Sequence, residues 1–151
     1  MNVQLFYFNN AKKVLDSHSH DVICSIINSV NVRIRKGNTR KLRDSIHHGL
    51  LLAGWPNKVK ISRESQITVT SIKNSTGLCL QFGNVARMYA DILKLQKLYL
   101  DGVIKDAIMI VPAKPVAKML GSNMVNSIRL ENELRVFNKV INVPVTLFEI
   151  S

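Results

Sequence analysis

Residues 77–111 constrain the fold more than any other part of this chain. The segment from Gly77 to Phe82 is short and mostly apolar, and Ala107 to Val111 is a continuous apolar run, so both predict strands. Between them, apolar residues recur at three- and four-residue steps from Asn84 to Leu100, which predicts an amphipathic helix. A strand, a helix and a strand over roughly thirty residues predict a βαβ unit with parallel strands.

The remainder of the chain predicts elements that flank this unit. We expect helices over 11–30 and 39–53, antiparallel strands over 58–62 and 67–72, a polar loop over 114–123, a helix over 125–140 and a last strand over 143–150. The sequence contains no internal repeat or linker. We therefore predict a single domain spanning 1–151, of the α/β class, with a central mixed sheet flanked by helices.

The charge of the chain favours a polyanionic partner. It carries 21 basic and 10 acidic residues, a net charge of +11, and binding to phosphates releases counterions. An ordinary basic surface is the alternative. No apolar run approaches the ~20 residues that span a bilayer, and the lysines near the N-terminus follow its apolar residues, unlike a signal peptide. We expect a cytoplasmic protein without membrane contact, in which Cys24 and Cys79 are reduced and buried.

Basic residues are concentrated near the start of the second expected helix. Within eleven residues the chain contains Arg33, Arg35, Lys36, Arg40, Lys41 and Arg43. Such a cluster can bind phosphates without choosing a sequence, or it can be a solvated face. With the net charge, it predicts a DNA contact. The histidines, in contrast, lack the spacing of a metal site and are expected at the surface or an interface: His18, His20, His47 and His48.

An ordered series of short motifs resembles the BglII/BstYI group of type II restriction endonucleases. The resemblance covers about residues 50–151 and depends on the order of the motifs, since each alone is weak. The motifs are Gln81-Phe82-Gly83-Asn84, the helical segment 91–96, the strand that ends at Val111-Pro112, the loop Gly121-Ser122-Asn123 and the closing segment 142–145. It implies a restriction-endonuclease-like fold of the PD-(D/E)xK type and a homodimer that cleaves duplex DNA with Mg²⁺.

The catalytic pattern implied by this resemblance is an aspartate, then a glutamate nine residues later, then a glutamine two residues further on. In this chain Gln81 occupies the glutamine position, Cys79 the glutamate position and Thr70 the aspartate position. Mg²⁺ prefers charged oxygen ligands, which neither a threonine nor a thiol provides. We therefore expect no metal at these positions and an impaired nuclease that binds double-stranded DNA without cutting it.

Three alternatives remain open at this stage. Glu64 or Asp91 could replace the missing acids in an active Mg²⁺-dependent endonuclease, although Glu64 also fits a turn and Asp91 a helix surface. Gln81 could simply satisfy a buried backbone group. The chain could also be a non-catalytic partner or antagonist of a related nuclease.

The resemblance also implies DNA contacts outside the catalytic positions. Lys73 and Arg87 flank the strand that faces DNA in the family, so we expect contacts with the phosphate backbone there. Asn84 and the pair Ser122-Asn123 belong to loops that point into the groove, where asparagine can bind adenine. Each is also a suitable helix cap. Two apolar stripes, near Tyr89 and Phe137, are expected in the core, and one of these helices could also meet a second subunit.

Overall fold

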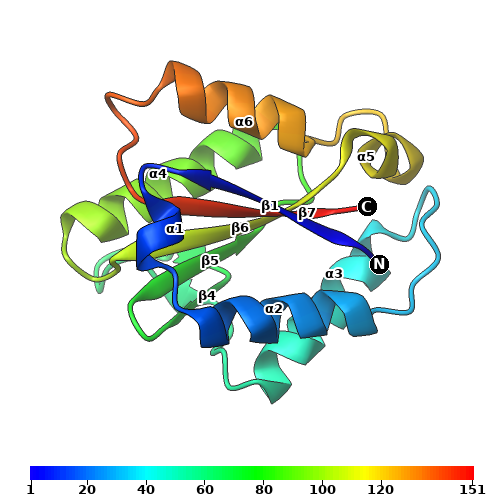
Figure 1. Cartoon of the computed structure of the whole chain (residues 1–151), viewed down its shortest axis with the longest axis horizontal. Coiled ribbons are helices and arrows are strands. Elements are labelled where there is room, and N and C mark those ends of the chain that lie inside the picture. The colour runs from blue at the N-terminus through cyan, green and yellow to red at the C-terminus, as the bar shows by residue number, and fades with distance from the viewer.

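A five-stranded mixed sheet forms the centre of the computed structural model, which describes all residues 1–151 (Figure 1). The strand order is β1-β7-β6-β5-β4. The strands are β1 (Val3–Phe8), β4 (Ser71–Lys73), β5 (Thr76–Leu80), β6 (Asp106–Pro112) and β7 (Val145–Ile150). Strands β5, β6 and β7 are parallel, whereas β1 and β4 pair antiparallel at the two edges. The α/β class and the mixed sheet expected from the sequence are therefore confirmed.

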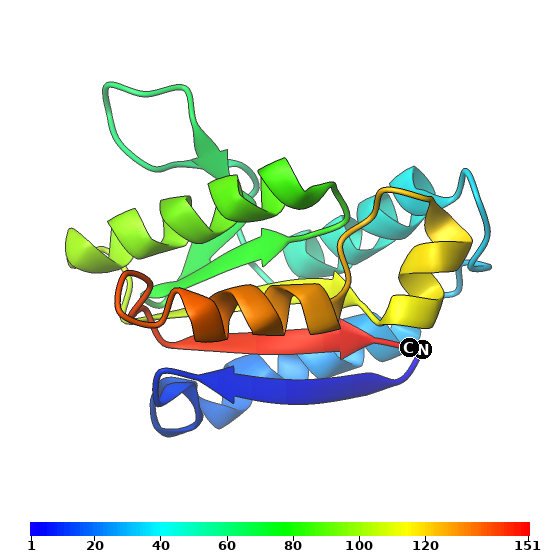
Figure 2. The same ribbon diagram turned by 90° about the horizontal axis from the view of Figure 1, so that it is seen from above.

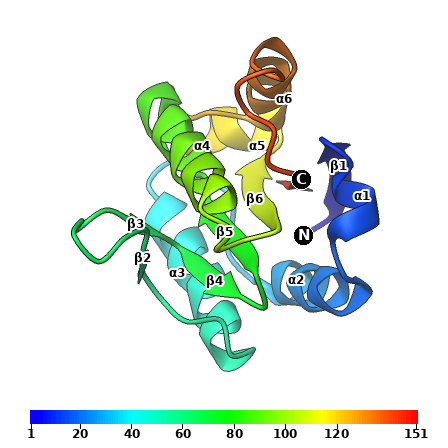
Figure 3. The ribbon, with the colours of Figure 1, turned by 90° about the vertical axis from the view of Figure 1, so that its left-hand side faces the viewer.

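Helices cover both faces of this sheet. They are α1 (Ala11–Val14), α2 (Ser17–Ser29), α3 (Thr39–Leu52), α4 (Val85–Leu100), α5 (Lys114–Leu120) and α6 (Ser127–Val136). Side chains alternate along β5, so that Leu78 and Leu80 join the core beneath α2 and α3, while Cys79 joins the core beneath α4 and α6. The sheet is thus the middle of three layers, as the end-on view shows (Figure 3).

The predicted strand–helix–strand unit is present as β5, α4 and β6. The register pairs Cys79 with Met109 and Leu80 with Ile110. Close packing of α4 on the sheet requires Gly77, since a Cβ atom there would lie 2.9 Å from side-chain atoms of both Leu95 and Ile104. The helix begins after Asn84, whose side chain accepts a hydrogen bond from the backbone N–H of Arg87 at 3.0 Å.

Several expected boundaries were wrong. The polar loop expected over 114–123 contains helix α5, and the helix expected over 125–140 is shorter, because α6 spans Ser127–Val136. The helix expected over 11–30 is divided into α1 and α2 at Asp16, which accepts a hydrogen bond from the Ser19 N–H at 2.8 Å and so starts a new helix. Strand β1 was not expected; it is an edge strand held by β7.

The strand expected over 67–72 is interrupted at Thr70. Its first part is β3 (Thr68–Val69), which pairs with β2 (Val59–Lys60) in a separate hairpin, and its second part is β4. This hairpin projects from the sheet, as the view from above shows (Figure 2). No helix has both the length and the apolar character needed to cross a bilayer.

Candidate functional site

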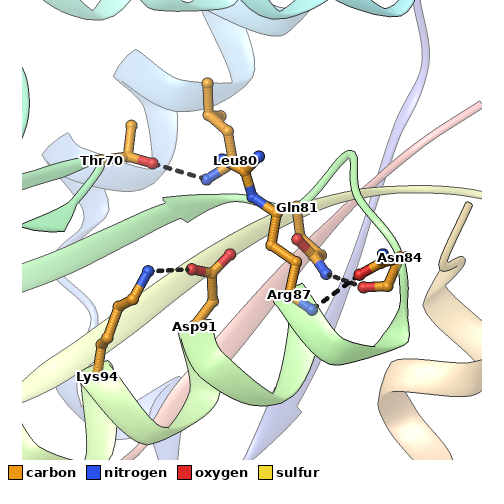
Figure 4. A network of polar contacts seen from close by, with 7 residues as sticks. All are labelled: Thr70, Leu80, Gln81, Asn84, Arg87, Asp91 and Lys94. Carbon is orange, nitrogen blue, oxygen red and sulfur yellow. Dashed lines mark hydrogen bonds and ion pairs between the residues drawn. The ribbon is translucent and has the colours of Figure 1, made fainter. Parts of the chain in front are cut away.

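The carboxyl ends of the parallel strands β5, β6 and β7 lie at the same end of the sheet, and the expected site residues gather there. All three strands run in the same direction, and the loops that follow β5 and β6 leave from that end (Figure 2). Ligands of open α/β sheets bind outside the carboxyl ends of the strands. Thr70, Gln81, Asn84 and Arg87 all lie at or near the end of β5, as the close-up shows (Figure 4).

The three positions assigned to catalysis by the resemblance lie together in the structure. Cys79 and Gln81 are two residues apart at the end of β5 and face the layer that contains α4. The hydroxyl of Thr70 accepts a hydrogen bond from the Leu80 backbone N–H at 3.1 Å, which fixes Thr70 beside that strand end. The fold is therefore compatible with the assignment of Thr70, Cys79 and Gln81 to one site.

Gln81 is completely buried and satisfies groups at the start of α4. In the amide orientation that satisfies both ends, its oxygen accepts from the Met88 backbone N–H at 2.8 Å and its nitrogen donates to Asp91 Oδ2 at 3.2 Å. The opposite orientation leaves only a 3.4 Å contact with the Asn84 carbonyl, the one drawn in Figure 4. Gln81 thus connects β5 to Asp91.

The two candidate replacement acids lie in different environments. Asp91 is buried on α4, and its Oδ1 accepts from Lys94 Nζ at 2.9 Å, so its charge is already compensated (Figure 4). Glu64 is exposed in the turn of the β2–β3 hairpin and does not line the cavity beside Thr70. Of the two, only Asp91 is brought to the strand end.

These donors do not fit Mg²⁺. Burial raises the pKa of the Cys79 thiol, and the nearby Asp91 carboxylate raises it further, so the sulfur stays protonated at neutral pH. Thr70 is a neutral ligand at best, and Asp91 is paired with Lys94. Nowhere in the structure do three His, Cys, Asp or Glu side chains gather as a metal ion would require.

A cavity lies beside Thr70, and basic groups line it. It has a volume of about 130 Å³, and its walls include Arg43 from α3, Lys58 from the segment before β2, and Arg87 and Lys94 from α4. Asp91 is the only carboxylate in its wall. Burial and the neighbouring Arg43 lower the pKa of His47, which also lines it, so the imidazole is neutral at neutral pH.

A larger open hollow of about 570 Å³ extends this basic surface along α3. It shares Arg43, His47 and Lys58 with the smaller cavity and adds Arg40 and His48. The other members of the predicted basic cluster, Arg33, Arg35, Lys36 and Lys41, are exposed in the loop before α3 and in its first turn. Arg40 forms one loose ion pair, with Asp44 at 3.7 Å, and the surface is otherwise available to an anionic partner.

The two predicted base-reading segments also lie together. Asn84, Ser122 and Asn123 line one open hollow of about 460 Å³. A backbone hydrogen bond from the Val125 N–H to the Gly83 carbonyl, at 2.9 Å, holds their two loops side by side. Asn84 caps α4 with its Oδ1, which leaves the Nδ2 group able to donate elsewhere.

Comparison with known proteins decides the family. The family model described as "Restriction endonuclease BglII/BglIII" matches residues 3–150. The chain belongs to this family. Two solved structures have the same fold: BglII complexed with a DNA 16-mer, at 15% identity and a TM-score of 0.88, and free BglII, at 16% identity and a TM-score of 0.79. Each covers 100% of this chain, which spans 78% and 80% of their lengths. No curated protein sequence matches the chain.

The match to the BglII/BglIII family includes the first forty residues, which the motif series did not cover. Those residues form β1, α1 and α2, and they complete the sheet edge and one helical layer. The termini are adjacent, because Asn2 and Ser151 exchange backbone hydrogen bonds of 2.9 and 3.1 Å.

Lys73 has a structural role in this family member. Its ammonium donates to the Ala53 carbonyl at 2.6 Å, at the C-terminus of α3, and lies 6.0 Å from the centre of the Trp55 ring. Cations stabilise helix C-termini, so the side chain is committed to holding α3 against β4. The phosphate contacts expected of Lys73 and Arg87 both stay predictions, and such a contact would compete with the hydrogen bond from Lys73 to Ala53.

Lys58 and Lys94 are site residues that the sequence did not indicate. Lys94 lies one helical turn after Asp91, a spacing that could have revealed the ion pair. Lys58 has no such signal. Its backbone N–H donates to the Thr70 carbonyl at 3.0 Å, which extends the pairing of β2 with β3 by one residue and places Lys58 beside Thr70.

Proposed function

We propose that this protein binds duplex DNA and does not cleave it. The observation that carries the proposal is the composition of the site at the end of β5. Thr70 and Cys79 occupy the two positions where the family is expected to have metal-binding carboxylates. Both are neutral, and the nearby Asp91 is paired with Lys94. Membership of a restriction endonuclease family and the fold shared with DNA-bound BglII support the DNA part of the proposal. The protein would meet its DNA in the cytoplasm.

The proposed DNA contacts divide into two groups. The basic surface of α3 and the preceding loop supplies phosphate contacts, which orient the protein but carry no sequence information. Asn84, Ser122 and Asn123 supply the groups that read base edges, because they share one hollow and include two carboxamides. Both groups lie around the carboxyl ends of the parallel strands.

We propose that the protein acts as a homodimer through α4 and α6. An apolar groove of about 260 Å³ runs between these helices and is lined by Leu93, Phe137 and Val140, among others. Leu93, Val136 and Val140 are exposed to 60%, 73% and 64%, and such clustered apolar surface is uncommon on a monomer. The hydrogen bond from Tyr89 Oη to Glu133 Oε2, at 2.6 Å, holds the two helices together.

An active Mg²⁺-dependent endonuclease is the alternative that one observation favours. Asp91 lies in the cavity beside Thr70 and could offer a metal one carboxylate if Lys94 moved away. A single carboxylate leaves most of the Mg²⁺ coordination to water and DNA. This alternative requires cleavage that depends on Asp91.

The test combines cleavage and binding on the same preparation. Supercoiled plasmid is incubated with Mg²⁺ or Mn²⁺, with EDTA as the control, and binding to short duplexes is measured by fluorescence anisotropy over a range of salt concentrations. We expect intact plasmid and salt-dependent binding. Metal-dependent fragments that disappear in Asp91→Asn would establish the alternative. Absence of both cleavage and binding would point to a partner or antagonist subunit instead.

A further inference from the structure

The cavity beside Thr70 has the charge of an anion site. Its walls contribute the cations Arg43, Lys58, Arg87 and Lys94, and the sole opposing carboxylate is Asp91. Asp91 is engaged by Lys94 at 2.9 Å and by the Gln81 amide at 3.2 Å. Positive charge from Arg43, Lys58 and Arg87 is therefore left without a carboxylate partner inside the cavity.

A buried donor in the wall also lacks a partner. The Nε–H of Arg43 is shielded from solvent and makes no hydrogen bond. Buried polar groups are nearly always hydrogen-bonded, and leaving one unsatisfied costs roughly 1–3 kcal/mol. Arg43 and Arg87 line the same cavity, and burial together with the Arg87 cation lowers the pKa of Arg43, since two like charges repel each other. An anion between them would relieve both effects.

We infer that this cavity binds a phosphate group directly, through Arg43, Lys58 and Arg87, with no divalent metal between protein and phosphate. Guanidinium groups hold phosphate oxygens by paired, charge-assisted hydrogen bonds, and lysine adds a point charge. The loss of both carboxylates and the gathering of cations have the same consequence. Together they favour an anion over Mg²⁺ at this site. The ligand that we infer is a backbone phosphate of duplex DNA, and this choice of ligand rests on the proposed function.

Free inorganic phosphate has the same chemistry and could occupy the cavity instead. The cavity volume of about 130 Å³ is several times the roughly 30 Å³ that one water occupies in the liquid, which leaves room for a tetrahedral oxyanion. The cavity is continuous with the hollow along α3, because both are lined by Arg43, His47 and Lys58. A phosphate of a DNA strand bound in the hollow would therefore reach the cavity. An experiment must separate these two sources.

The first arm measures inorganic phosphate binding by isothermal titration calorimetry in EDTA. The test variant is Arg43→Gln/Arg87→Gln, and the control is Lys12→Gln/Lys13→Gln, which removes two exposed cations from α1, outside the cavity. We expect wild type and control to bind phosphate alike and the test variant to bind at least tenfold more weakly. Circular dichroism and urea unfolding check that both variants are folded. Equal phosphate binding by folded test and control variants would overturn the inference.

The second arm measures duplex DNA binding by anisotropy, with EDTA or with Ca²⁺ at matched ionic strength. We expect no gain of affinity with metal, a loss of about tenfold to a hundredfold in the test variant, and displacement of bound phosphate by DNA. DNA binding that requires metal, or that the test variant retains in full, overturns the inference while the proposed function stands. Phosphate binding without any DNA binding removes the proposed function and leaves the cavity as a site for free phosphate.

Discussion

Lys94 and Asp91 form an ion pair of 2.9 Å on the face of α4 that looks toward Thr70. The side chain of Asp91 is only 7% exposed, so the loss of Lys94 leaves a buried carboxylate with the Gln81 amide as its remaining partner. We expect Lys94→Gln to lower the free energy of unfolding by about 1–3 kcal/mol.

Urea unfolding measures this loss, and Lys97→Gln is its matched control. Lys97 pairs with Asp101, the residue that follows α4, but the two side chains are 41% and 46% exposed, so we expect a change below ~0.5 kcal/mol. Equal effects of the two substitutions would show that the Asp91 pair is not special.

The degenerate metal site should be restorable by two substitutions. Thr70→Asp places a carboxylate in the wall of the cavity, and Cys79→Glu places a second one on the buried face of β5, two residues before Gln81. We expect the double variant to bind Mn²⁺ and Mg²⁺, measured by calorimetry, and its DNA affinity to become dependent on metal. Thr70→Asn/Cys79→Gln is the uncharged control of similar size. A folded double variant without metal binding would mean that the catalytic positions are misassigned.

The sequence allowed the strand–helix–strand unit to be predicted because its signals are local. The apolar run of β6 and the three- and four-residue repeat of α4 each describe one element by itself. Strand β1 could not be recognised in this way, because its pairing with β7 joins Val3 to Ile150. Helix α5 looked polar because Lys114 and Pro115 open it. Proline is nonetheless tolerated in a first helical turn, and Val116 and Leu120 bury the other face.

The candidate site was predicted only in part for a similar reason. The resemblance identified Thr70, Cys79 and Gln81, and their proximity is compatible with the fold. The cations of the cavity come from three separate segments, α3, the segment before β2, and α4. No spacing rule connects Arg43, Lys58 and Arg87 along the chain, so their gathering follows only from the way the fold brings α3, the segment before β2 and α4 to one cavity.

The groove between α4 and α6 predicts a dimer that one charge should dissociate. Leu93 is 60% exposed and lines this groove, so Leu93→Asp would place a carboxylate in the centre of the proposed interface. We expect the dimer to weaken at least tenfold in sedimentation-velocity experiments. Leu52→Asp, at a residue 77% exposed near the end of α3, is the control. Identical, monomeric behaviour of wild type and both variants would remove the dimer from the proposal.

Asp106 makes the stability of the fold depend on pH. Burial raises the pKa of this carboxyl group, although the Thr76 hydroxyl donates to its Oδ1 at 2.7 Å, and its Oδ2 has no partner. The folded protein therefore holds this proton to higher pH than the unfolded chain does. The contribution of Asp106 to stability is consequently largest at acidic pH and falls as pH rises from the unfolded value, 3.8, through the raised one.

Asp106→Asn tests this linkage. We expect it to stabilise the protein at pH 7 by ~1 kcal/mol, because it removes a buried charge and keeps an acceptor for Thr76. Its advantage over wild type should shrink toward pH 4. Urea midpoints across this range measure both effects, with Asp101→Asn as an exposed control. An advantage that stays constant with pH would show that Asp106 does not titrate as described.

Asn84 combines a helix cap with the proposed recognition of a base, and the two roles can be separated. Asn84→Asp keeps the oxygen that accepts from the Arg87 N–H but removes the amide donor, so we expect stability to change by less than ~0.5 kcal/mol. DNA affinity should fall by about tenfold, since one paired hydrogen bond to a base edge discriminates by roughly 1–3 kcal/mol.

The matched control is Asn126→Asp, which adds the same charge at the cap of α6. Asn126 accepts from the Arg129 N–H at 3.2 Å and lies outside the hollow that contains Asn84. Asn84→Ser, a neutral cap, should behave like Asn84→Asp. If the Asn84 and Asn126 variants bind duplexes of all sequences equally well, Asn84 is a cap alone, and sequence reading must belong to Ser122 and Asn123.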